Sequence, residues 1–162
     1  NGVRPLLDLK TGMRIPWTIL ILFGGGLCLA KLIQISGVAS HVSDSLSTVI
    51  HGYPYWISIT LLCAVTLLMT EITSNVATIS ALLPIVYALA IKLNLNPLLL
   101  LFPVTLSASC AFMLPVATAP NAMAFSQTNI SVLSMAKGGI KLNIVSLIII
   151  LFFTLTWTKI FI

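Results

Sequence analysis

Long apolar runs separated by short polar segments restrict the folds open to this chain more than any other feature of its sequence. Hydrophobic residues make up 59% of the 162 residues and charged residues 7%, with a mean hydropathy of +1.13. A soluble domain of this size needs a polar surface that this composition does not supply. Several runs approach the roughly 20 apolar residues that a spanning helix needs. We therefore predict an all-α integral membrane protein that lies in a lipid bilayer.

The composition also argues against several classes of function. The net charge is +5, but the eight Lys and Arg residues are scattered near the ends of apolar runs, where they suit interfacial anchors. We therefore expect no nucleic-acid partner. Cys28, Cys63 and Cys110 lie in apolar segments without metal-ligand spacing, so we expect buried free thiols. With three acidic residues, and no His in an apolar segment to activate a serine, the chain has little support as an enzyme, and no catalytic residue is expected.

The apolar runs divide the chain into seven predicted segments. These are a loop at 1–15, a transmembrane helix at 16–35, a connector at 36–54 whose stretch 38–50 suits a short interfacial helix, a hairpin at 55–92 with its tip at 73–76, a broken transmembrane helix at 97–126 with a gap at 115–120, a loop at 127–141, and a transmembrane helix at 142–162. The first residue is Asn1 rather than Met, and no secretory signal precedes the first apolar run. We expect the chain to be the later part of a longer protein.

The hairpin allows two geometries. Apolar segments at 55–72 and 77–92 are joined by four residues, 73–76. The hairpin is either two full spans with a polar turn in water, or a re-entrant hairpin whose tip stops inside the membrane. Turn chemistry does not choose between them, although Pro84 slightly favours the re-entrant form because it shortens or kinks the return arm.

Two prolines predict where the next helix breaks. Pro115 and Pro120 remove two helix hydrogen bonds and clash with carbonyl groups upstream. We expect the helix to open between them and to resume from Asn121 through Phe125. The result is a discontinuous helix with freed carbonyl groups in its gap.

Two short polar stretches, 73–78 and 117–122, fall deep inside the apolar sequence. Unpaired polar groups are costly in a bilayer and are tolerated where they bind something. Amide and carbonyl oxygens suit sodium, and helix N-termini attract carboxylate, phosphate or sulfate. The alternative is that the prolines and the Ser-Asn turn only kink and cap helices that pack together.

Glu71 and the glycine triplet 24–26 allow further expectations. Glu71 lies two residues from the hairpin tip. It is either a proton or cation carrier, or a carboxylate that faces a protein cavity and pairs with a Lys or Arg of another element. The triplet suits a close approach of another backbone inside the membrane.

Orientation follows from the positive charges in the short loops. Arg4, Lys10 and Arg14 lie in the loop 1–15, and Lys137 and Lys141 lie in the loop 127–141, so both loops are expected to be cytoplasmic. The connector 36–54 has no Lys or Arg and is expected outside, as is the C-terminus. The membrane is expected to be the plasma membrane. The positive charges of Lys31 and Lys92 do not fit this orientation, but each side chain can extend from a helix end to the membrane interface.

The residues from Ala108 to Met123 resemble the signature of the divalent-anion:sodium symporter family, which includes sodium-coupled dicarboxylate, citrate and sulfate transporters. The agreement ends at Ala124, where the family usually has Val. Pro16-Trp17, the segment 22–26 and the segment 70–75 match in order and spacing. The resemblance extends from about Pro16 to Ile162 and is to the C-terminal half of these transporters.

This resemblance implies the second of two inverted repeats, with a re-entrant hairpin and a discontinuous helix, in a homodimer that works by elevator-like movement. The preceding repeat, with its own Ser-Asn-Thr tip, is missing here, so the chain alone is not expected to transport. The implied sodium (Na+) ligands are Thr70, Thr73, Asn75, Ala117 and Asn121, partly through backbone oxygens. The implied substrate contacts are Ser74, Asn75, Val76, Thr118 and Ala119.

The implied activity is sodium-coupled symport of di- or tricarboxylate anions of the succinate or citrate type. The chain departs from the family at Val76, where Thr or Pro is common, and at Ala119, where Pro is usual. Val76 removes a hydroxyl that could bind the anion, and Ala119 restores one amide donor. The alternatives are a non-transporting membrane fragment or scaffold isoform, a sodium:sulfate symporter, and an uncoupled or proton-coupled anion exchanger.

Overall fold

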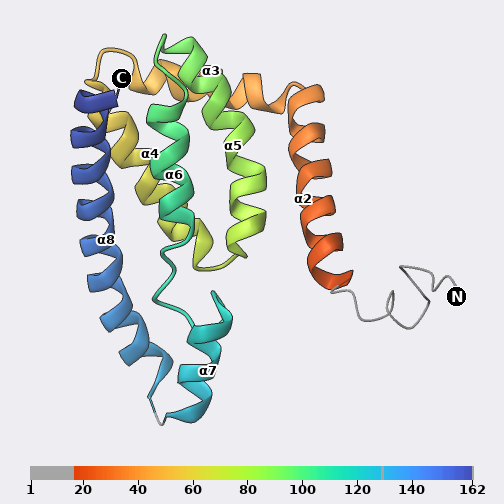
Figure 1. Cartoon of the computed structure of the whole chain (residues 1–162), viewed down its shortest axis with the longest axis vertical. Coiled ribbons are helices and arrows are strands. Elements are labelled where there is room, and N and C mark those ends of the chain that lie inside the picture. Colours follow the sequence, from red (N-terminus) through yellow and green to blue (C-terminus); the bar gives the residue numbers. More distant parts are fainter. Residues whose placement is uncertain (1–16, 129, 162) are drawn as a thin grey trace, which may run out of the picture.

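Within residues 17–128 and 130–161, which the computed structural model describes, every regular element is an α-helix (Figure 1). The fold is all-α, as the apolar runs indicated. The helices in chain order are α2 (Trp17–Ile35), α3 (Val38–Ile50), α4 (Tyr55–Thr70), α5 (Asn75–Lys92), α6 (Leu98–Ala108), α7 (Ala119–Gln127) and α8 (Val132–Phe161). The loop predicted at 1–15 lies outside the described residues.

Two of the described helices are long and apolar enough to cross a membrane, namely α5 and the part of α8 from Val132 to Thr156. A third crossing is reached if α2 and α3 are taken as one bent span. The bend is 68° and follows Gly37, whose φ of 77° lies in the left-handed region that favours glycine. The amphipathic stretch 38–50 is thus a separate helix, α3, which runs across one end of the other helices (Figure 1).

The main core lies between α3, α4, α5, α6 and α8. Helix α6 packs against α4, α5 and α8, while α2 contacts α5 and α3. Pro84 and Pro103 are buried inside α5 and α6 without ending either helix. Cys63 is buried, but Cys28 on α2 is exposed, contrary to the expectation for all three thiols. The buried core residues are Ile50, Ile59, Leu62, Cys63, Val86, Leu89, Ala90, Leu100, Val104 and Ile150.

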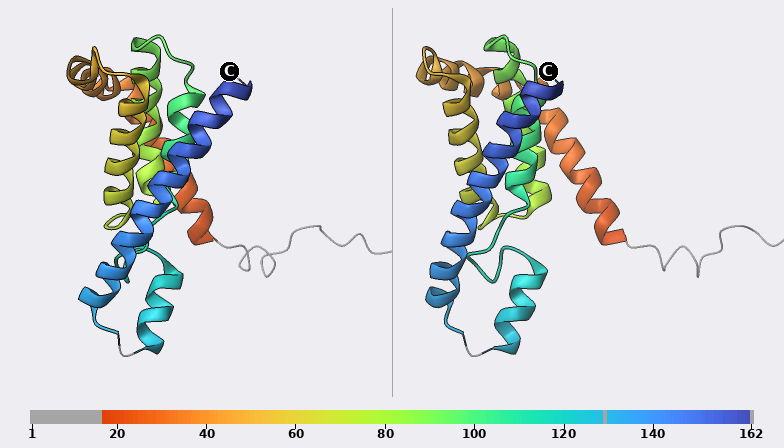
Figure 2. Two further views of the ribbon diagram at one scale, coloured as in Figure 1. Left: turned by 90° about the vertical axis from the view of Figure 1, so that its left-hand side faces the viewer. Right: turned by 60° about the vertical axis from the view of Figure 1, so that its left-hand side comes forward.

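The hairpin turn lies two residues earlier than the predicted tip at 73–76. Helix α4 ends at Thr70 and α5 begins at Asn75, so Asn75 and Val76 belong to the first turn of α5. The reason is the N-cap: Ser74 has an extended backbone (φ −69°, ψ 147°), and its Oγ accepts a hydrogen bond from Ala77 N at 3.2 Å. The turn lies partway along α8 rather than at the end of the molecule (Figures 1 and 2).

The helix break is longer than the gap predicted at 115–120 and begins before either proline. Helix α6 ends at Ala108, and α7 begins at Ala119 rather than Asn121, with Pro120 in its first turn. Pro120 is compatible with a helix there because the first-turn N–H groups have no intrahelical acceptor. The early end of α6 results from contacts with the hairpin, described below.

The loop predicted at 127–141 is mostly helical. Helix α8 begins at Val132, and Ser131 Oγ accepts a hydrogen bond from Ser134 N at 3.2 Å before its first turn. Its 30 residues span about 45 Å at 1.5 Å per residue, which exceeds the roughly 30 Å apolar core of a bilayer. Lys137 and Lys141 are exposed near its start. The α7–α8 connection lies at one end of the molecule, and α3 and the α5–α6 turn lie at the other (Figure 2).

Candidate functional site

The end of α4, the start of α5 and the end of α6 meet at the hydroxyl of Thr70. Thr70 Oγ1 lies 2.7 Å from Asn75 Oδ1 and 2.7 Å from the carbonyl oxygen of Ala108. Thr70 is fully buried and Asn75 is half-buried. Because the hydroxyl has one proton for two acceptors, three oxygen atoms from three elements come together at the point where α6 stops.

Thr73 and Ser74 make their contacts within the hairpin. Thr73 Oγ1 donates to the carbonyl of Met69 at 2.8 Å and lies 2.6 Å from Thr78 Oγ1. Ser74 caps α5 through Ala77 N. Both side chains are exposed in the described part of the chain, so they reach the surface of the turn beside the break.

The gap between α6 and α7 is folded around Asn121. Its Nδ2 donates to the carbonyl oxygens of Ala111 at 2.9 Å and Leu114 at 3.1 Å. Thr118 Oγ1 accepts a hydrogen bond from Asn121 N at 3.3 Å and so caps α7. Ala117 is 8% exposed, and its N–H donates to Leu114 O at 3.2 Å. Three of the predicted residues, Ala117, Thr118 and Asn121, are therefore brought together here.

The carboxylate of Glu71 connects the hairpin to the gap. Its Oε1 accepts hydrogen bonds from Phe112 N at 2.9 Å, Met113 N at 3.1 Å and Asn143 Nδ2 at 2.8 Å. Its Oε2 accepts from Met113 N at 2.9 Å and Leu114 N at 3.1 Å. Glu71 is 3% exposed. The expected partner, a Lys or Arg of another element, is replaced in the described structure by backbone amides and one side-chain amide.

Sequence reasoning missed four residues that shape this site: Ala108, Thr78, Asn143 and Gly139. Gly139 and Asn143 are four apart and lie on the same face of α8, which approaches the gap. A Cβ at Gly139 would lie 2.5 Å from Met113 Cα, so only glycine allows this approach. A glycine and an asparagine four residues apart in a mostly apolar helix were the signal available in the sequence.

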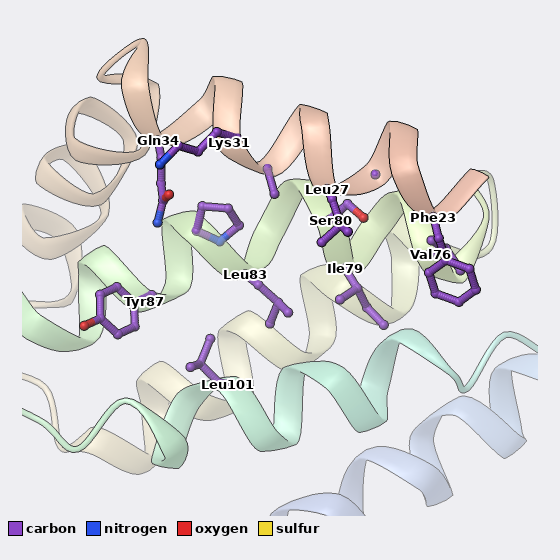
Figure 3. A pocket seen from close by; sticks show the side chains of 13 residues that line it. Phe23, Leu27, Lys31, Gln34, Val76, Ile79, Ser80, Leu83, Tyr87 and Leu101 are labelled. Atoms are coloured by element: carbon purple, nitrogen blue, oxygen red, sulfur yellow. The ribbon is translucent and has the colours of Figure 1, made fainter. Parts of the chain in front are cut away.

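A cavity of about 610 Å³ lies between α2 and α5 (Figure 3). Val76 lines it near Phe23, while Lys31, Gln34 and Tyr87 lie toward the other end. The Val76 side chain is therefore on the α2 side of α5. The remaining lining residues are Gly26, Leu27, Ala30, Ile79, Ser80, Leu83, Pro84 and Leu101.

One member of the glycine triplet lies close to a neighbouring helix, but not to the backbone that was predicted. A Cβ at Gly26 would lie 2.5 Å from Ser80 Oγ, whereas Cβ atoms at Gly24 and Gly25 would meet nothing within 4 Å. The neighbour at Gly26 is a side chain of α5 rather than another backbone.

Together these contacts gather oxygen atoms around Thr70 and around Asn121. The hydroxyl, amide and carbonyl oxygens around Thr70 are hard neutral donors of the kind that coordinate sodium. The first turns of α5 and α7 contain the N–H groups of Asn75, Val76 and Ala119, which precede the first intrahelical hydrogen bond. Such N-termini attract anions. Across the described residues, no group of three or more His, Cys, Asp or Glu side chains gathers to bind a metal ion.

Residues 4–162 match the protein family described as the sodium:sulfate symporter transmembrane region. The sequence is 41% identical over 145 residues to a sodium-dependent dicarboxylate transporter, SdcS, of Staphylococcus saprophyticus, and 43% identical over 148 residues to SdcS of Staphylococcus aureus. These alignments cover 90% and 91% of the present chain. They cover 28% of each relative, so the chain spans little more than a quarter of their length.

Proposed function

Because the chain belongs to the divalent-anion:sodium symporter family, we propose that it supplies one sodium site and half of an anion site to a sodium-coupled symporter. The rest of the site would come from a preceding repeat of the same polypeptide. The complete carrier is proposed to be a homodimer in the plasma membrane.

The observation that carries this proposal is the convergence of Thr70 Oγ1, Asn75 Oδ1 and the Ala108 carbonyl oxygen where α6 ends. A sodium ion would take the place of the hydrogen bonds that the Thr70 hydroxyl makes. These oxygens from three elements are already close together, so ordering them on binding would cost little free energy. Thr73, Ala117 and Asn121 complete the proposed sodium set. Asn121 contributes by holding the gap carbonyls in place and through its own oxygen.

The anion is proposed to lie between the first turns of α5 and α7. Ser74, Asn75 and Val76 would contribute from α5, and Thr118 and Ala119 from the start of α7. Because the Val76 side chain is directed toward the α2 cavity, its contribution comes from its backbone N–H. Ala119 likewise offers a backbone N–H that a proline at this position would lack.

The proposed substrates are di- and tricarboxylates of the succinate and citrate type. The names of the two staphylococcal relatives favour a dicarboxylate, whereas the family description names sulfate. The amide donors at two helix N-termini suit either anion, so uptake measurements must distinguish them.

The test uses the full-length protein that contains this chain, reconstituted in liposomes. Asn75→Ala and Asn121→Ala are expected to abolish sodium-dependent uptake of succinate while the protein remains in the membrane. Asn75→Ala removes an oxygen of the Thr70 cluster, and Asn121→Ala releases two gap carbonyls. Asn96→Ala is the matched control, because Asn96 Oδ1 accepts a hydrogen bond from Leu98 N at the distant α5–α6 turn.

Uptake of succinate, citrate and sulfate is compared in sodium and in potassium. Uptake that is independent of sodium would favour an anion exchanger, and no uptake by the intact protein would favour a non-transporting scaffold. Unchanged uptake in both Asn75→Ala and Asn121→Ala would contradict the site assignment.

A further inference from the structure

Glu71 is the buried acidic residue of the described structure, and its position differs from that of the other described acid. Asp44 is exposed and forms an ion pair with Lys92. Among the described residues Glu71 pairs with no such cation, and it instead accepts hydrogen bonds from three consecutive backbone amides and from Asn143. Burying a carboxylate without partners costs much free energy. A buried carboxylate is therefore stable only when both of its oxygens accept hydrogen bonds.

The donors around Glu71 come from two elements other than its own. The N–H groups of Phe112, Met113 and Leu114 converge on the carboxylate and hold the gap backbone in a curved, non-helical path. Asn143 reaches it from α8. These contacts account for the non-helical path before Pro115: Phe112 N, which would donate to the Ala108 carbonyl in a continued helix, donates to Glu71 instead.

We propose that Glu71 is a positioning residue that sets the geometry of the sodium site. Its neighbour Thr70 contacts the Ala108 carbonyl, and Glu71 fixes the amides of 112–114. Thr70 and Glu71, which are adjacent at the end of α4, thereby bind the backbone at both ends of the first part of the gap, Ala108 and 112–114. The Ala108 oxygen can stay beside Thr70 and Asn75 only while the backbone that follows it is held by Glu71.

Helix α8 also contacts both Glu71 and the gap backbone. Asn143 Nδ2 is bound to Glu71 Oε1, and the glycine one turn earlier, Gly139, lies against the backbone of Phe112 and Met113. The end of α4, the gap and α8 are thus joined through one carboxylate. The same contacts occupy the gap amides, so an anionic substrate must use the N-termini of α5 and α7.

This inference rests on the proposed function, and its test uses Glu71→Gln and Asn143→Ala in the full-length protein. Glu71→Gln places an NH₂ donor against backbone N–H donors. We expect the sodium concentration for half-maximal uptake to rise about tenfold or more, consistent with losing a hydrogen bond to a charged group. Asn143→Ala removes one donor and should raise it about threefold. Asn96→Ala serves as the amide control, because Asn96 Oδ1 accepts its hydrogen bond from Leu98 N at the α5–α6 turn.

The readout that separates positioning from direct ion carrying is the charge moved per anion transported, measured in proteoliposomes. A positioning role leaves this ratio at the wild-type value in Glu71→Gln, whereas a carrier role changes it. At saturating sodium, the KM for succinate should stay within about threefold of wild type, since the α5 and α7 amides remain in place.

Each result decides the inference. An unchanged sodium dependence in Asn143→Ala, or an altered charge ratio in Glu71→Gln, would overturn it. If Glu71→Gln does not fold, Asn143→Ala alone decides. If the wild-type protein shows no sodium dependence, the proposed function fails and not only this inference; if the wild type is sodium-dependent and the variants match it, only this inference fails.

Discussion

At the scale of single residues, several buried polar groups at the gap are paired with particular partners. Glu71 and Asn121 each satisfy backbone groups of the gap, and Asn143 donates a hydrogen bond to the Glu71 carboxylate. Gly139 contributes through packing rather than hydrogen bonding, because its lack of a side chain lets α8 contact the same backbone. A polar contact and a close approach thus stabilise the same non-helical segment.

Gly139→Ala in the full-length protein is expected to lower the thermal unfolding midpoint and sodium-dependent uptake. A Cβ there would lie 2.5 Å from Met113 Cα, so the backbone must shift, and overpacking of this kind typically costs about 1–3 kcal/mol. The control is Gly138→Ala, because a Cβ at Gly138 meets nothing within 4 Å. Equal melting midpoints for the two variants, measured in detergent, would contradict the approach of α8.

At the scale of elements, the helix ends at the site are set by caps. Ser74 and Thr118 both have extended backbones and accept a hydrogen bond from the N–H three residues later. These caps begin α5 and α7 at Asn75 and Ala119, and they direct two helix N-termini to the region of the gap. Pro115 and Pro120 are compatible with this path but do not end α6.

Ser74→Ala is expected to reduce sodium-dependent uptake by the full-length protein, because α5 loses a cap worth about 1 kcal/mol and the tip loses its hydroxyl. Ser74→Thr keeps a hydroxyl in the capping position and should retain most of the uptake. Initial rates at fixed membrane abundance make the comparison. Equal rates for the Ala and Thr variants would show that the hydroxyl of Ser74 has no role.

At the scale of the whole molecule, the α5–α6 turn and the α7–α8 connection lie at opposite ends (Figures 1 and 2). Helix α3 and the α5–α6 turn lie at one end, and the start of α8 lies at the other (Figures 1 and 2). Lys92 opposed the charge count made from the sequence, but it pairs with Asp44 of α3 and contributes little net charge to its end. Lys137 and Lys141 are exposed near the start of α8. This distribution supports the proposal that the α8 start is cytoplasmic.

Single cysteines test this orientation in the full-length protein with its native cysteines replaced. Thr48→Cys on α3 should react with a membrane-impermeant maleimide on intact cells, because Thr48 is exposed at the end proposed to lie outside. Ser134→Cys, exposed near the start of α8, should react only after the cells are permeabilised. The reverse labelling pattern would invert the proposed topology and place the C-terminus inside.

The sequence alone determined the all-α membrane fold, the interruption of the apolar runs and the family, because hydropathy and a local signature depend on residues close together in the chain. It did not determine where α6 stops, since the prolines suggested a break at 115–120. That position was decided by Thr70 and Glu71, which are about 40 residues away from the backbone they bind. A hydrogen bond between distant segments leaves no local pattern, so the tertiary structure alone decided the path of the gap and the role of Glu71.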